Sequence, residues 1–260
     1  MKKDQSKEIG ISVVKSLFSA VPWVGGLLNE GFFDYWGRVK QGRLNNFTQM
    51  LAEYFSENPD IQPETIRTED FCDLFESVVR KVLQTKSKEK HLRFRSILIH
   101  QIHHPNIDAG SVEICLELIA SLDEVAISIL KAHLEWHNAY YPIKAEQQKV
   151  LDDLEAQGKE LNELKINAAV NQMRIDELTL VYNENQEIKE AYNQKILDLQ
   201  TFREANYFQL TDAEYLYYKQ SLYAKGLLID KGMGTYSGKI FYYMWLTEFG
   251  IRFLEFIVYN

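Results

Sequence analysis

The residues best suited to chemistry in this sequence are its six histidines, which all fall between His91 and His137. His133 and His137 are four positions apart, so on a helix both imidazoles would lie on one face, as a shared metal ion requires. The zinc-protease motif has its glutamate directly after the first histidine, but Glu135 stands two positions on. Surface and helix-cap histidines explain the cluster better than metal ligands do. We therefore expect no metal and no cofactor.

Motifs for covalent or nucleotide chemistry are missing from the sequence. It contains no Gly-x-Ser-x-Gly nucleophile turn, no Gly-x-x-x-x-Gly-Lys-Ser/Thr phosphate loop and no dinucleotide-binding glycine fingerprint. Cys72 and Cys115 lie in separate apolar-periodic segments and form no Cys-x-x-Cys pair, so we expect reduced core residues. The sequence therefore favours a protein that is not an enzyme.

The charge balance argues against a nucleic-acid partner. The formal net charge is -8 and the isoelectric point is near 5.4, whereas neutralising phosphates requires a basic surface. A basic run from Lys81 to Arg95 fits the outer face of an amphipathic helix. From Tyr207 onward, Lys and Arg are matched in number by Asp and Glu, where a DNA reader would carry a positive excess.

The segment from Ile11 to Trp36 allows two interpretations. Its aromatic side chains surround glycines, as in segments that bind a membrane surface or insert into a partner. Packing in a bundle core is the favoured interpretation, because acidic and amide side chains within the segment would be costly in lipid. No stretch reaches the roughly 20 apolar residues of a membrane span, and no signal-peptide cleavage site stands out, so we expect a cytoplasmic protein. The residues for conditional insertion would be Phe18, Trp23, Leu28, Phe32 and Trp36.

The spacing of apolar residues and helix breakers predicts a mainly α-helical chain with three regions. Residues 1–141 have the pattern of a helical bundle, residues 142–206 carry a heptad repeat, and residues 207–260 fit a small α+β module. At 260 residues and 46% hydrophobic content, the chain can bury a sizeable core.

The middle region predicts a coiled coil. From Ile143 to about Glu204 there is no proline and a single glycine, which favours one helix about 90 Å long. An antiparallel hairpin turning at Tyr182–Asn185 is the alternative, although no residue there enforces a turn. The d positions also hold three amides, which would specify register: Gln157, Asn171 and Asn185. We expect self-association, as a homodimer or higher oligomer, through seam residues Leu154, Leu161, Leu164, Ile175 and Leu178.

The C-terminal region has the outline of a winged-helix module. Thr211 to Glu214 form a capping box that opens a helix ending at Gly226. Two strands around a glycine-rich tip follow, and a short helix closes the chain. Aromatic residues of the module's first helix, among them Tyr215 and Tyr218, suit a protein interface.

The order of these features resembles the bacterial abortive-infection alpha proteins. The shared motifs are a Pro-x-x-Gly-Gly turn at Pro22 to Gly26, the step His104-Pro105, and the ending Leu246-Thr247-Glu248-Phe249-Gly250-x-x-Phe253. They cover mainly residues 10–140 and 210–258. Members are associated with phage resistance and lack an assigned catalytic site, so the resemblance implies a role in defence without giving a mechanism.

These observations lead to one expected function and two alternatives. We expect a non-enzymatic antiphage-defence protein of the abortive-infection type, which acts through self-association and contacts with a protein partner. The first alternative is a winged-helix DNA-binding regulator dimerised by the coiled coil. The second is a membrane-perturbing effector that uses the N-terminal amphipathic segment.

Overall fold

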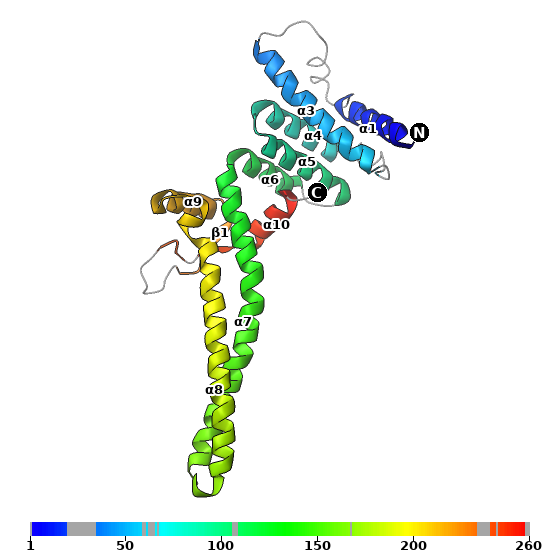
Figure 1. Ribbon diagram of the computed structural model, residues 1–260. Coiled ribbons are helices and arrows are strands. Elements are labelled where there is room, and N and C mark those ends of the chain that lie inside the picture. Colours follow the sequence, from blue (N-terminus) through cyan, green and yellow to red (C-terminus); the bar gives the residue numbers. More distant parts are fainter. Residues whose placement is uncertain are drawn as a thin grey trace. The chain divides into compact units, whose positions relative to one another are not determined.

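The structure, a computed structural model, describes residues 2–19, 35–58, 61, 66, 68–105, 109–166, 168–232, 240–242 and 244–257. Over these residues the protein is mainly α-helical, as the sequence predicted, with one small antiparallel sheet (Figure 1). The chain forms two compact units: residues 1–123 together with 252–260, and residues 124–251. The second unit is therefore an insertion within the first. This division differs from the three regions expected from the sequence, because a helix continues through residue 141.

The first unit is built from helices whose starts follow local capping rules. The side chain of Thr68 accepts a hydrogen bond from the backbone N–H of Phe71, and Ser87 accepts one from Lys90 in the same way. Both caps satisfy amide groups that have no partner inside the helix. The helices are α1 (Lys2–Ser19), α3 (Tyr35–Glu57), α4 (Glu69–Gln84), α5 (Lys88–His103) and α6 (Ala109–Ser121).

Helix α1 lies against α3 at a close contact that requires glycine (Figure 1). A Cβ atom at Gly10 would clash with the backbone oxygen of Ala52 and would lie 3.0 Å from the backbone nitrogen of Ser56. The rings of Phe18 and Phe75 meet edge to face, with their centroids 5.1 Å apart. The N-terminal helix thus packs into the core of the first unit at both points.

The second unit begins with two long helices that lie side by side and run in opposite directions (Figure 1). They are α7 (Glu124–Lys165), which passes through Pro142, and α8 (Ala168–Asp198). Two 3-10 turns follow, η1 (Leu199–Arg203) and η2 (Ala205–Phe208). The unit is completed by α9 (Asp212–Ala224), β1 (Leu228–Asp230), β2 (Met244–Leu246) and the first part of α10 (Glu248–Ile257).

The expectation of one continuous helix from 143 to 204 is wrong. The chain turns at Ile166, and the two halves of the heptad segment form a hairpin, here called the α7–α8 hairpin. The alternative turn at Tyr182–Asn185 is also wrong, since those residues lie inside α8. The physical reason is that a hairpin buries both halves of the seam against each other within one chain. A turn without proline or glycine gives no local signal of its position.

The C-terminal segment has the predicted order of helix, two strands and helix. Thr211 and Glu214 form the predicted capping box at the start of α9, and Gly226 has a φ of 71°, which glycine adopts without strain. The strands are only three residues each and pair Leu228 with Leu246. Buried Asp230, at the end of β1, accepts hydrogen bonds from the backbone N–H groups of Gly232 (2.8 Å) and Phe241 (2.6 Å). Its carboxylate thus holds together two segments that are separate in sequence.

Candidate protein-interaction surface

The inner face of the α7–α8 hairpin consists of the predicted seam residues. Leu161, Ile175 and Leu178 form a buried cluster, and two partly buried residues, Leu164 and Tyr182, pack against it. Leu154, which precedes Leu161 on α7, is buried as well. The predicted seam therefore does bury its a and d side chains, but the partner helix belongs to the same chain.

Amide side chains fix the register of this hairpin. The side chain of Asn185 donates to Gln157 at 3.2 Å, and Asn171 donates to the backbone oxygen of Leu164 at 3.3 Å. Closer to the base of the hairpin, buried Gln147 donates to Asn193 at 2.7 Å. A shift along the helix would leave these polar groups unpaired in a partly buried site, which is costly. The amides expected to specify register thus make interhelical hydrogen bonds within one chain.

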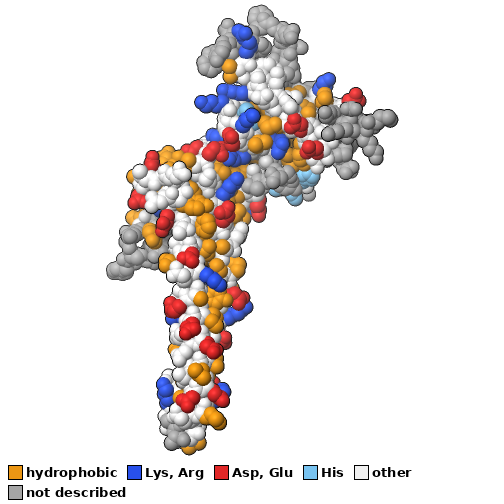
Figure 2. Space-filling model, in the orientation of Figure 1, with side chains coloured by type: hydrophobic (Ala, Val, Ile, Leu, Met, Phe, Trp, Pro, Cys, Tyr) orange, Lys and Arg blue, Asp and Glu red, His pale blue; other side chains and the backbone are white. Residues whose placement is uncertain are grey.

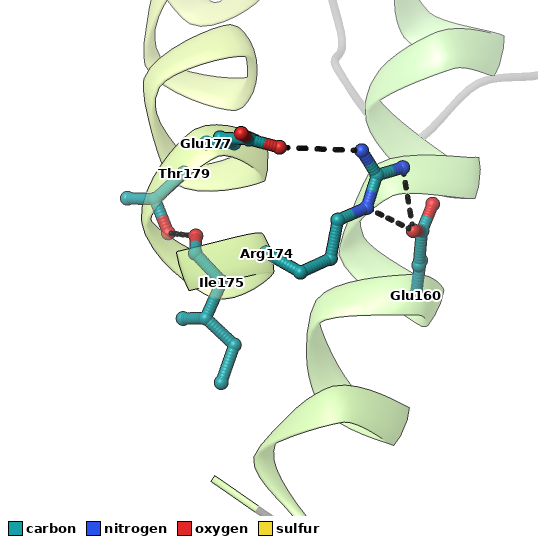
Figure 3. Close-up of polar contacts among 5 residues, drawn as sticks. All are labelled: Glu160, Arg174, Ile175, Glu177 and Thr179. Atoms are coloured by element: carbon teal, nitrogen blue, oxygen red, sulfur yellow. Dashed lines mark hydrogen bonds and ion pairs between the residues drawn. The ribbon is translucent and has the colours of Figure 1, made fainter. Parts of the chain in front are cut away.

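An ion pair joins the two helices near the turn (Figure 3). Arg174 on α8 donates from Nε and Nη2 to the same carboxylate oxygen of Glu160 on α7, at 3.2 and 3.0 Å. Its third nitrogen, Nη1, lies 3.8 Å from Glu177. All three side chains are largely exposed, so the pairs contribute little stability and can exchange partners.

Helix α8 also carries a second apolar face, which α7 does not cover. Val170 is 80% exposed, Met173 76% and Leu180 66%. With exposed Val181 and Ile188, these side chains recur at i, i+3, i+10, i+11 and i+18, so they fall within an arc of about 100°. We call these five residues the outer apolar stripe. Figure 2 shows hydrophobic side chains along the hairpin, interspersed with charged ones.

The outer apolar stripe is separate from the face that packs on α7. At 100° per residue, its centre lies about 140° around α8 from the centre of Ile175, Leu178 and Tyr182. A surface helix of a globular protein normally has one apolar face directed at the core. Exposed Glu177 and Glu184 fall within the same arc, so the stripe is interrupted by charges. Exposed apolar side chains gathered along one face of a helix mark a candidate surface for binding another protein.

The tyrosines predicted to form an interface occupy different environments. Tyr215 is only 4% exposed and its ring stacks on Phe208 at 5.5 Å, so it belongs to the interior of the second unit. Tyr218 is half-buried beside Tyr217, which is exposed. Tyrosine occurs at both buried and exposed positions of α9, so the sequence alone did not indicate which of these tyrosines face the interior.

An aromatic cluster that the sequence did not reveal joins α7 to the C-terminal strands within the second unit. The rings of Trp136 and Trp245 meet edge to face at 4.6 Å, and Tyr140 stacks on Trp136 at the same distance. Arg203 lies over Trp136 at 4.4 Å and donates to the backbone oxygen of Met244. The only signal in the sequence was the presence of isolated tryptophans far apart in the chain.

The two candidate metal ligands lie in surroundings unlike those of a metal site. His133 is 1% exposed, its Nδ1 donates to the backbone oxygen of Ile129 at 2.8 Å, and its Nε2 has no hydrogen-bond partner. Burial, with smaller effects of nearby Arg203 and Lys219, lowers its pKa to about 4. The ring of His137 packs on Tyr141 at 4.6 Å. Within the described parts of the chain, no three His, Cys, Asp or Glu side chains are grouped so as to hold a metal ion.

Most residues of the possible insertion segment lie outside the described residues. These are Trp23, Leu28 and Phe32, and the side chain of Trp36 is likewise not described. Phe18 is buried against Phe75, in agreement with the core interpretation for that residue. Within the part of the chain that the structure describes, no helix combines the length and apolar character needed to cross a bilayer.

The fold and this surface define the class: a mainly α-helical protein in which an antiparallel helical hairpin presents an uncovered apolar stripe. No family model, no curated protein and no solved structure matches the chain.

Proposed function

We propose that this chain is a non-enzymatic protein of antiphage defence that acts in the cytoplasm through protein contacts. The observation that carries the proposal is the outer apolar stripe on α8. Three of its side chains, Val170, Met173 and Leu180, expose most of their surface, although α8 already buries another face against α7. Covering such a stripe with a partner would remove apolar surface from water, at about 25 cal/mol per Å².

The defence setting rests on the resemblance to abortive-infection alpha proteins. The motifs at Pro22 to Gly26, at His104-Pro105 and at Leu246 to Phe253 support it. The acidic net charge of -8 supports protein contacts rather than nucleic-acid contacts within that setting. Self-association and a separate protein partner are both compatible with this setting.

The DNA-binding alternative has weaker support. Of the two lysines on or next to α9, Lys219 lies over the ring of Tyr215 at 4.6 Å, and burial lowers its pKa. A recognition helix needs several exposed cations directed at phosphates and bases. The membrane alternative depends on the segment around Trp23 and Leu28, which lies outside the described residues.

The test is a phage plating assay with the chain expressed beside its native neighbouring genes. Leu180→Glu places a charge in the stripe, while Asn183→Glu places the same charge on an exposed position outside it. We expect the wild type and Asn183→Glu to reduce plating of some phages and Leu180→Glu to lose this effect while its helical circular dichroism is unchanged.

Two results would contradict the proposal. Unreduced plating of every phage in a broad panel by the wild type would remove the defence assignment. Full protection by a folded Leu180→Glu variant would show that the outer apolar stripe is not the working surface.

A further inference from the structure

We infer that an acidic pocket in the first unit binds a small aliphatic polyamine. The pocket has a volume of about 310 Å³ and is lined by side chains of α4, α5 and α6. This size is at the lower end of the range for sites that take small molecules. The inference is independent of the outer apolar stripe, because the stripe lies on α8 in the other unit and shares no residue with the pocket.

Three exposed carboxylates line the acidic pocket. Asp70 and Asp73 come from α4, where a spacing of three positions puts both on one face, and Glu113 comes from α6. Lys81, one of the cations of α4, is already paired with Glu117 at 2.6 Å. Among the residues that the structure describes, none of the three carboxylates forms an ion pair. The pocket therefore carries negative charge on two helices without a compensating cation from these residues.

Stabilisation of helix ends accounts for only one of these charges. An acidic side chain in the first turn of a helix interacts favourably with the positive end of the helix dipole. Asp70 lies in the first turn of α4, but Asp73 lies beyond it. Helix α6 begins at Ala109 and has no acidic residue in its first turn, so Glu113 also lies too far along. The other two charges remain to be explained.

A buried amide lines the same pocket from α5. Gln101 is only 8% exposed. Its Nε2 donates to the backbone oxygen of Pro105 at 3.4 Å, while its Oε1 has no hydrogen-bond partner among the described residues. A buried acceptor without a donor is costly, and an N–H group of a ligand would supply that donor. This side chain therefore indicates a ligand that donates hydrogen bonds.

The rest of the lining is mainly apolar. Val112 and Leu116 are buried, and Leu74 is half-buried. Half-buried Ser77 adds one hydroxyl group. Apolar side chains beside exposed carboxylates suit a molecule in which a methylene chain joins cationic ends. The chain is removed from water while the ammonium groups form charge-assisted hydrogen bonds.

The placement of the carboxylates favours an organic cation over a metal ion. A metal ion needs several ligands within about 2.0–2.6 Å of one point. In the described parts of the chain, no three acidic, histidine or cysteine side chains are grouped in that way. Carboxylates on two helices can instead each accept from a separate ammonium group. A polyamine would thus pair with Asp73 and Glu113 at once, whereas a single ammonium group would not.

Calorimetric titration of spermidine into the full chain tests the inference. A ligand with about ten non-hydrogen atoms should bind with a dissociation constant on the order of 0.1 mM. Asp73→Asn and Glu113→Gln should each weaken binding about tenfold, because each removes a hydrogen bond between charged groups. Glu69→Gln is the matched control, since it removes the same charge from an exposed residue of α4 outside the pocket, and it should change the affinity less than about twofold.

Gln101→Leu tests the buried acceptor separately. It keeps a side chain of similar size but removes Oε1, so spermidine should bind about threefold to tenfold more weakly while the helical circular dichroism is unchanged. The carboxylate variants alter only exposed side chains, and they decide the case if Gln101→Leu does not fold.

Four results would overturn the inference. The first is no binding of spermidine up to about 10 mM. The second is equal affinity for butylamine, which would mean that the pocket takes a single ammonium group such as that of a lysine side chain. The third is displacement of spermidine by Mg²⁺ beyond the effect of NaCl at the same ionic strength, which would indicate a metal site. The fourth is an equal effect of Glu69→Gln and Asp73→Asn, which would mean that overall acidity, and not the pocket, attracts the ligand.

Discussion

Replacing Leu178 by alanine should destabilise the α7–α8 hairpin by about 2 kcal/mol. Leu178 is 6% exposed and packs with Leu161 and Ile175, and burying a leucine is worth about 1.5–3 kcal/mol. Leu→Ala in a full core costs about 2–5 kcal/mol because a cavity remains. The site here lies between only two helices, which can close partly around the gap, so the lower end of that range applies.

Leu180→Ala provides a matched control, because it makes the same chemical change two positions along the same helix. Leu180 is 66% exposed, so its truncation should change stability by no more than about 0.5 kcal/mol. Hydrogen exchange read by mass spectrometry reports the opening free energy of the hairpin separately from the rest of the chain. We expect amides of α7 and α8 to exchange about thirty-fold faster in Leu178→Ala than in the wild type.

Two results would refute the hairpin reasoning. The first is an equal effect of the two substitutions, which would mean that Leu178 is not buried more than Leu180. The second is a Leu178→Ala effect that grows on dilution of the protein, since a seam formed between two chains depends on concentration and a hairpin within one chain does not.

Three further predictions concern the cores of the two units. Gly10→Ala should lower the free energy of unfolding by about 1–3 kcal/mol through overpacking, and the thermal midpoint should fall with it. Gly42→Ala, whose added Cβ meets nothing within 4 Å, should raise the free energy of unfolding by about 0.5–1 kcal/mol. Similar effects of the two substitutions would contradict the close contact between the helices. Asp230→Ala should cost about 1–3 kcal/mol in urea unfolding followed by tryptophan fluorescence, and Asp230→Asn should cost less because one acceptor remains. His133 is neutral when folded, with a pKa of about 4 against its ordinary 6.5, so the unfolded state binds the proton more readily between these values. The contribution of His133 to the free energy of unfolding should be full above pH 6.5 and should be lost as the pH is lowered towards 4. A plot of the urea unfolding midpoint against pH should therefore fall over this range, and His133→Gln should make it flatter there.

The sequence located the C-terminal elements because their signals are local. A capping box at Thr211 and a glycine with positive φ at Gly226 each mark one end of α9. The sequence also identified the inner face of the hairpin, because the heptad positions of Leu161 and Leu178 are buried in the structure.

The turn and the outer apolar stripe were beyond this reasoning for physical reasons. A heptad pattern identifies which side chains are buried, but it carries no information on whether the opposite helix belongs to the same chain. Val170 and Met173 lie off the seam, and a search for one apolar face per helix passes over a second one. A count of apolar residues at i, i+3 and i+10 on the remaining faces of α8 would have found it.

Residues 252–260 belong to the compact unit built mainly from residues 1–123. Phe256 already contributes to it, with its ring 4.1 Å from that of His100, and Phe253 and Leu254 are buried. Chains grow from the N-terminus, and domains generally fold as units in the order of synthesis. Here the first unit lacks part of its core until residues 252–257 have been synthesised, whereas the inserted hairpin can form earlier. A nascent chain that has not yet reached residue 252 would therefore present an open core to chaperones and proteases.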